Sequence, residues 1–246
     1  MKKKSIYSGS AVFLTAVVFA ALFLFSLAAC QSTNTGTGGQ GTKLLYQGHS
    51  SFRFTARNGT VIYLDPFVPN GYDLPADIIL VTHQHGDHSQ VQLVTQNPGC
   101  VVITQDEALA GGKHNTFTIN GIVIEAVEAY NDWHQITEAV GYIITIDGIK
   151  VYAAGDTSTT GQMKTFAAEK LDYALIPCDG VFNMDGGEAG ECAAVIGAKH
   201  NIPIHTGPFD ENYSPLPGFF DRTIAEKFTA PNRMILEPGQ EIVLAK

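Results

Sequence analysis

Short runs rich in β-branched and aromatic residues recur from Lys43 onward and are separated by turn residues. Three of the separating dipeptides are Asn58-Gly59, Asn120-Gly121 and Asp147-Gly148. Asn or Asp followed by Gly tolerates the positive φ angles of the tight turns that join antiparallel strands. The pattern therefore predicts hairpins in series. The predicted strands are 43–48, 51–57, 60–65, 77–82, 100–104, 116–119, 122–129, 140–146 and 150–155.

Helical patterning occurs only between these runs, at 89–96, 106–110, 158–170 and 188–199. Strands and helices are therefore mixed along the chain, with the hairpins concentrated early. Hydrophobic residues make up 45% of the sequence, which is enough to form a substantial core. Together these features predict an α/β fold of stacked sheets covered by helices.

The first 29 residues differ in composition from the rest of the chain. Lysines at 2–4 precede the uncharged apolar run 11–29, a pattern typical of a secretory signal. The letters LAAC at 27–30 are similar to a bacterial lipobox, which implies cleavage before Cys30 and lipid attachment to that cysteine. A retained anchor helix is the alternative, because about 20 apolar residues span a bilayer.

The segment that follows, QSTNTGTGGQGT, is uncharged and almost without apolar residues, so it predicts a flexible tether. We therefore expect a lipoprotein signal peptide at 1–29, a lipidated cysteine and tether at 30–42, and one folded domain at 43–246. The expected location is the cell membrane, with the domain on the extracytoplasmic side.

Acidic residues outnumber basic ones. Without the three lysines at 2–4, the 15 basic residues fall to 12, which against 24 acidic residues leaves a formal balance of −12. Such a surface repels nucleic acid and anionic lipid headgroups, so no nucleic-acid partner is expected. The small-molecule substrate that we expect is implied by the resemblance described below. The sequence gives no indication of the oligomeric state.

Three cysteines remain beyond Cys30, namely Cys100, Cys178 and Cys192. An odd number in an exported domain cannot all pair, and no CxxC spacing indicates a structural zinc site. We expect mostly small buried residues, with one disulfide at most.

The stretch VTHQHGDHSQ carries four metal-type donors within six positions. It leaves a predicted buried strand, and residues two apart in an extended segment point to the same side, so His83 and His85 should converge. Gly86 should permit a sharp turn that brings Asp87 and His88 round from the next helix. Imidazole nitrogen and carboxylate oxygen suit Zn, Mn, Fe or Ni. The alternative is a polar loop whose histidines cap that helix.

The letters THQHGDH resemble the HxHxDH motif of the metallo-β-lactamase superfamily. Upstream, GHSSFRF and VIYLDPF within 48–67 are similar to the opening hairpin of the branch that includes ascorbate-6-phosphate lactonase-like proteins. Downstream, VYAAGDT at 151–157, DYALIPCDG at 172–180 and IPIHTGP at 202–208 follow in the expected order. The resemblance implies a four-layer αββα sandwich of the metallo-β-lactamase type.

The same resemblance implies one or two divalent metal ions, zinc first, with Mn, Fe or Ni as alternatives. The implied ligands are His83 and His85 at the first ion, Asp87, His88 and His205 at the second, and Asp156 bridging both.

The first ion needs another ligand, and here the chain departs from the family pattern. Asn131 occupies the expected place in the segment EAYNDWHQITEAVGYII, and His134 lies three residues later. We expect His134 to be the ligand. An Asn131 amide, a water molecule or a site with only one metal are the alternatives.

Two further residues are candidates for supporting roles. Asp65 ends a predicted buried strand, and the resemblance implies a carboxylate that orients a histidine ligand. His49 is expected to line the active site as a proton donor or substrate contact. An ordinary turn residue is the alternative in each case.

The implied activity is hydrolysis by a metal-activated water, with Asp87 as the catalytic residue that orients this water and accepts its proton. A lactone or other cyclic ester is the first expectation for the substrate, and a phosphodiester is the second. A divergent β-lactamase is a further alternative. The opposing class is a catalytically silent, membrane-tethered metal-binding or receptor protein, which an incomplete first metal site would favour.

Overall fold

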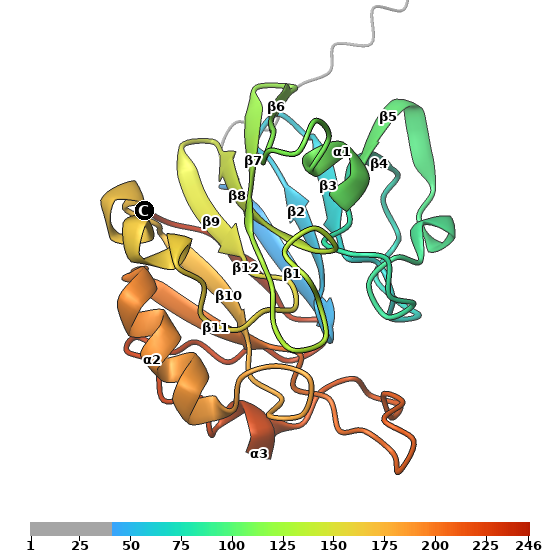
Figure 1. Cartoon of the computed structure of the whole chain (residues 1–246). Coiled ribbons are helices and arrows are strands. Elements are labelled where there is room, and N and C mark those ends of the chain that lie inside the picture. The colour runs from blue at the N-terminus through green and yellow to red at the C-terminus, as the bar shows by residue number, and fades with distance from the viewer. Residues whose placement is uncertain (1–40) are drawn as a thin grey trace, which may run out of the picture. The chain divides into compact units, whose positions relative to one another are not determined.

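The computed structural model describes residues 41–246, which fold into two six-stranded sheets and a few short helices (Figure 1). The predictions of a signal peptide at 1–29 and lipidation at Cys30 lie outside these residues, as does most of the predicted tether. Within 41–246, no helix has both the length and the apolar character needed to cross a membrane.

The first sheet contains the N-terminal strands, in the order β12-β1-β2-β3-β4-β5. Its members are β1 (Lys43–Gly48), β2 (Ser51–Thr55), β3 (Val61–Leu64), β4 (Ala76–Leu80), β5 (Gln96–Ile103) and β12 (Glu241–Val243). Strands β12 to β3 are antiparallel, whereas β3, β4 and β5 run parallel.

The second sheet follows the order β11-β10-β9-β8-β7-β6. Its members are β6 (Thr116–Ile119), β7 (Ile122–Glu128), β8 (Val140–Ile146), β9 (Ile149–Ala153), β10 (Tyr173–Pro177) and β11 (His200–Ile204). Strands β6 to β9 are antiparallel, and β9, β10 and β11 run parallel. The helices are α1 (Gln105–Ala108), α2 (Gly186–Ile196) and α3 (Arg222–Ala225), with 3-10 helices η1 (Val91–Leu93) and η2 (Gln162–Glu169).

The main core lies between the two sheets, because alternate residues of each strand point to opposite faces. Phe52 and Phe54 of β2 pack in the same buried cluster as Tyr142 and Ile144 of β8. The intervening residue Ile143 belongs instead to a cluster with α2 and η2 on the outer face of the second sheet. This layered packing confirms the predicted α/β sandwich of the metallo-β-lactamase type.

The outer face of the first sheet is covered by loops and one short turn. The predicted helix 89–96 is wrong: only the 3-10 turn η1 forms. The reason is strand pairing, because β5 already begins at Gln96, opposite Ala76 of β4. Tyr72 and Leu74 of the loop after β3, together with Val91 of η1, pack on this face.

Cys100, Cys178 and Cys192 are all free thiols, so no disulfide forms among the described residues.

The parallel strands of each sheet send their carboxyl ends toward the same region of the molecule. The loop after β4 is tied to the second sheet there, since Tyr142 donates its hydroxyl hydrogen to the Val81 carbonyl at 3.0 Å. The backbone N–H of Val140 also donates to the Thr82 carbonyl at 3.0 Å. The loops that follow β3 and β4 therefore meet those that follow β9, β10 and β11.

Candidate metal centre

The loop after β4 and the loop between β7 and β8 bring three histidines together. The ligand atoms of His83, His85 and His134 lie within 4.8 Å of one another. His134 Nε2 is 3.0 Å from His85 Nδ1. These three side chains form a first donor group of imidazole nitrogens.

Asn131 belongs to the same β7–β8 loop but turns its side chain into that loop. Its Oδ1 accepts hydrogen bonds from the backbone N–H groups of Trp133 at 2.9 Å and His134 at 3.0 Å. The same oxygen lies 2.9 Å from His134 Nδ1, and the amide nitrogen donates to the Phe182 carbonyl. His134, rather than Asn131, therefore lies beside His83 and His85.

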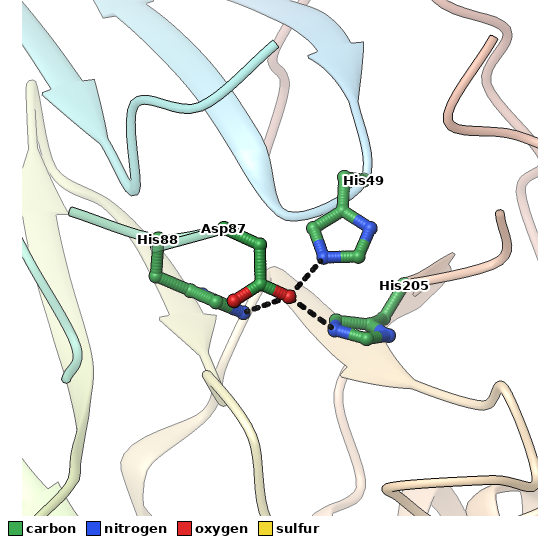
Figure 2. A group of neighbouring side chains, drawn as sticks. All are labelled: His49, Asp87, His88 and His205. Carbon is green, nitrogen blue, oxygen red and sulfur yellow. Dashed lines mark hydrogen bonds and ion pairs between the residues drawn. The ribbon is translucent and has the colours of Figure 1, made fainter. Parts of the chain in front are cut away.

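A second donor group contains His49, Asp87, His88 and His205 (Figure 2). Asp87 Oδ2 lies at its middle, 3.1 Å from His49 Nε2, 3.8 Å from His205 Nε2 and 4.0 Å from His88 Nε2. These residues come from the β1–β2 turn, the loop after β4 and the loop after β11. The group thus joins both sheets.

Asp156 follows β9 and lies between the two donor groups. Its two oxygens are 3.4 Å from His88 Nε2 and 3.5 Å from His205 Nε2. It also forms a potential metal-binding group with His83 and His88. One carboxylate therefore faces donors of both groups, as a bridging ligand would.

Each buried histidine of the two groups except His49 has its second ring nitrogen next to a polar side chain. This contact fixes the orientation of the ring and its tautomer. Asp65 Oδ2 is 2.9 Å from His88 Nδ1, and the Thr82 hydroxyl is 3.1 Å from His83 Nδ1. For His134, the neighbouring polar side chain is that of Asn131.

Asp179 supports His205 and was not anticipated from the sequence. Its Oδ2 lies 2.9 Å from His205 Nδ1, and its side chain is completely buried. The available signal was that β10 and β11 are parallel neighbours ending at one sheet edge, with Asp179 two residues past β10 and His205 one past β11.

His49, the fourth member of the second group, does not lie on an open surface. Its side chain is fully buried, and its ring packs 3.8 Å from that of His205, centroid to centroid. Burial and the neighbouring His205 lower the pKa of His49 to about 4. This location favours contact with Asp87 over the expected contact with substrate.

Three residues of the centre adopt left-handed backbone conformations, namely His49 (φ 54°), Asp65 (φ 44°) and His205 (φ 55°). Such conformations are costly for residues other than glycine and persist where surrounding bonds enforce them. Here the His205 N–H donates to the His49 carbonyl at 2.9 Å, and the Asp65 N–H donates to the Leu80 carbonyl at 2.9 Å. These hydrogen bonds therefore help to hold the strained backbone of the centre in place.

Gly86 does not have the role expected of it. It is absent from the glycines with positive φ, and a Cβ there would meet only the Gln90 amide, at 3.7 Å. The turn is made instead by the His88 N–H, which donates to the His85 carbonyl at 3.0 Å.

The electrostatics of the centre keep the Asp156 carboxylate ionised. Burial would raise the pKa of Asp156, but His205, His88 and His83 hold it below its ordinary value. Burial would lower the pKa of His88, but Asp156, Asp65 and Asp87 outweigh it and raise the pKa to about 9. Carboxylates and imidazoles therefore stabilise opposite charges in each other within this buried space.

Several buried donor atoms face this space without a hydrogen-bond partner. They are Nε2 of His83, His88 and His205 and Oδ1 of Asp156. Buried polar atoms are normally paired, so a cluster of unpaired ones on nitrogen and carboxylate ligands indicates a cation site. The residues present therefore fit one or two divalent ions.

The centre opens into a cavity of about 510 Å³. Asp87, with 25% of its side chain exposed, lines this cavity together with His85, His134 and Asp156. The remaining wall contains aromatic side chains from four separate loops. A small molecule in the cavity would therefore contact both donor groups.

Stacked sheets with histidine and aspartate donors at their strand ends define a metallo-β-lactamase type of protein. A family model described as the Beta-lactamase superfamily domain matches residues 43–205, from β1 to His205. The chain is 33% identical to a UPF0173 metal-dependent hydrolase of Nitratidesulfovibrio vulgaris, over 68% of this chain and 81% of the relative. The chain therefore belongs to the beta-lactamase superfamily, within the UPF0173 metal-dependent hydrolases.

A second relative and a solved structure also resemble this chain. A UPF0173 metal-dependent hydrolase of Thermococcus kodakarensis is 29% identical over 82% of this chain and 99% of its own length. The structure of a metallo hydrolase from Ignicoccus hospitalis superposes with a TM-score of 0.63 at 21% identity, covering 83% of this chain and 99% of that one. At this identity the second likeness shows the fold alone. The expected affinity with ascorbate-6-phosphate lactonase-like proteins stays a prediction.

Proposed function

We propose that this metal-dependent hydrolase cuts a lactone or other cyclic ester with water at a centre of two divalent cations. The observation that carries the proposal is the position of Asp156, which faces donors of both groups at one side of an open cavity. A receptor without catalysis would need no such shared, cavity-facing carboxylate.

His83, His85 and His134 would hold the first cation, and Asp87, His88 and His205 the second, with Asp156 between them. Zinc suits this set best, because the first group offers only imidazole nitrogen and the second mixes imidazole with carboxylate. Bound cations would lower the pKa of water toward 7 and polarise the carbonyl oxygen of the ester.

Asp87 is the residue that we place next to the attacking water. It is more exposed than Asp156, and it lies on the cavity wall. Burial would raise the pKa of Asp87, but His205, His49 and His88 hold it well below its ordinary value. The ionised carboxylate accepts a hydrogen bond from water and orients it, and then takes its proton.

The reaction adds one water across the ring ester. The water oxygen bonds to the carbonyl carbon, the bond from that carbon to the ring oxygen breaks, and the proton passes to the departing alkoxide. The product is the open-chain hydroxy acid. His49 Nε2, 3.1 Å from Asp87 Oδ2, keeps the Asp87 carboxylate in place during this transfer.

The test is turnover of a lactone panel by the zinc-loaded protein, with phosphodiester and β-lactam panels alongside. We expect lactone hydrolysis, and its loss by at least about a thousandfold in His85→Ala and Asp156→Ala, while both variants keep the wild-type circular dichroism spectrum. Faster turnover of phosphodiesters or β-lactams than of lactones would mean that the faster class, and not lactones, contains the substrate. Full metal binding without any turnover would identify a silent receptor.

We also propose that the domain is tethered to the membrane by lipid on Cys30, with the domain outside the cytoplasm. The support is the lipobox-like LAAC at 27–30 after the apolar run. Cys30→Ser should abolish lipid incorporation and release the protein from its membrane. Unchanged membrane retention of this variant would favour an uncleaved anchor helix instead.

A further inference from the structure

The cavity beside the metal centre has an aromatic wall, which we define as Phe67, Trp133, Phe182 and Tyr213. Trp133 belongs to the β7–β8 loop, Phe182 to the loop after β10, and Tyr213 to the loop after β11. The Phe182 ring lies between the others, 5.4 Å from Trp133 and 5.9 Å from Tyr213, centroid to centroid. Both contacts are edge to face, so side chains of these three loops form one apolar surface. Phe67, from a fourth loop after β3, lines the same cavity.

Two members of this wall are exposed to a degree that is unusual for large rings. Trp133 is 61% exposed and Tyr213 is 64% exposed. Neither ring is therefore a core residue, and each leaves apolar area available to a ligand. Removing such apolar area from water favours binding of an apolar group.

The cavity lacks the residues that recognise a charged phosphate group. Among the described residues that line it, none is Lys or Arg, and the two charged side chains, Asp87 and Asp156, are both acidic. Phosphate recognition usually employs Arg or Lys. An anionic substituent on the substrate would find no partner along this wall.

From these observations we infer that the substrate is an uncharged ester ring carrying an aromatic or comparably large apolar substituent, which packs against Trp133 and Tyr213. The inference rests on the proposed lactonase activity and makes Trp133 and Tyr213 specificity-determining residues. It also disfavours lactones that carry a phosphate on this substituent.

The kinetic test compares two lactones of one ring size, γ-phenyl-γ-butyrolactone and γ-valerolactone, which differ in a phenyl or methyl substituent. The zinc-loaded protein should favour the phenyl compound by at least about tenfold in kcat/KM, which corresponds to about 1.4 kcal/mol. Trp133→Ala and Tyr213→Ala should each reduce this preference several-fold, and Tyr213→Phe should retain it. Equal kcat/KM for the two lactones, or an unchanged preference in both alanine variants, would overturn the inference.

The matched control is Val243→Ala, because Val243 on β12 is 61% exposed and lies outside the cavity lining. It should leave the preference at the wild-type value. A loss of preference in this variant equal to that in Tyr213→Ala would mean that the effect is not local to the wall, and the inference would fail.

A binding test separates this inference from the proposed function. Trp133 is the single tryptophan of the chain, so its fluorescence reports ligands at the wall without requiring turnover. The phenyl lactone should shift this fluorescence with a Kd at least about tenfold below that of the methyl lactone. If no lactone is hydrolysed, the proposed function fails. Tighter binding of the phenyl lactone would then still show that the aromatic wall binds an apolar substituent. Equal binding of the two lactones would overturn the inference.

Discussion

Asp65 Oδ2 lies 2.9 Å from His88 Nδ1, and the Asp65 carboxylate also accepts hydrogen bonds from the backbone N–H and the hydroxyl of Thr82, at 2.7 and 2.8 Å. The Thr82 hydroxyl is in turn 3.1 Å from His83 Nδ1. One buried carboxylate therefore orients a histidine of each donor group. The centre is built as a connected network and not as two independent sites.

Asp65→Asn tests this network. An amide cannot hold both Thr82 and the His88 ring as the carboxylate does, so the affinity of the second donor group for zinc should fall by about 10- to 100-fold. Competitive chelator titration measures this affinity. Asp77→Asn is the control, because Asp77 on β4 binds the Val61 N–H and Asn97, away from the centre. Wild-type zinc affinity in Asp65→Asn would refute the role.

The third ligand of the first group is tested by comparing His134→Ala with Asn131→Ala. Loss of the His134 imidazole should reduce bound zinc from two equivalents per chain to one. Loss of the Asn131 side chain removes only the group that holds His134, so both equivalents should remain with a weakened first site. Elemental analysis after dialysis gives the counts. The reverse pattern would make Asn131 the ligand.

Position 155, directly before Asp156, is predicted to tolerate only glycine. Its φ is +64°, and a Cβ there would lie 2.9 Å from Thr82 Cβ. Gly155→Ala should lower the free energy of unfolding by about 1–3 kcal/mol, measured in urea, because the backbone is strained and Thr82 must move. Gly161→Ala is the matched control, since its φ is −62° and nothing lies within 4 Å of the added Cβ. Equal stability of the two variants would contradict this account.

The lowered pKa of Asp147 predicts how the free energy of unfolding depends on pH. Burial slightly opposes its charge, but the Arg57 N–H at 2.8 Å and the Thr42 hydroxyl at 2.7 Å lower the pKa of Asp147 below its ordinary value. A carboxyl whose pKa is lower in the folded state stabilises the fold above its unfolded pKa of about 3.9. That stabilisation is lost as the pH falls through the folded pKa.

Asp147→Asn should therefore cost about 1 kcal/mol of unfolding free energy at pH 7. The difference from the wild type should shrink progressively below about pH 4. Urea unfolding at pH 7 and at successively lower pH values provides the measurement. A difference that stays constant over this range would show that the charge of Asp147 contributes nothing.

Much of the centre could be predicted because its donors are concentrated in one loop. The spacing of His83, His85, Asp87 and His88 after a buried strand is a local pattern, and local patterns are visible in a sequence. The sequence does not decide whether Asn131 or His134 is the ligand, because His134 lies three residues beyond the position that the family pattern expects. Only the folded loop shows that the Asn131 side chain turns into the loop and hydrogen-bonds His134. Local spacing therefore indicated the donors of this one loop, the resemblance implied Asp156, His205 and the supporting Asp65, and neither indicated Asp179.

The features that were missed depend on contacts between distant segments. Asp179 meets His205 because β10 and β11 are parallel, and the aromatic wall joins side chains of four loops that share no spacing. The predicted helix at 89–96 failed for a related reason, since pairing of β5 with β4 overrides local helical preference. Tertiary pairing, which no short pattern encodes, decided these points.

The most direct test of the central claim is anomalous X-ray scattering from crystals of the zinc-loaded protein, recorded on both sides of the zinc edge. We predict two zinc peaks, one about 2.0–2.1 Å from nitrogens of His83, His85 and His134 and the other at the same distance from nitrogens of His88 and His205. Asp156 should lie between the two peaks. Zinc peaks located only away from these histidines, or none at saturating zinc, would contradict the proposed hydrolytic centre.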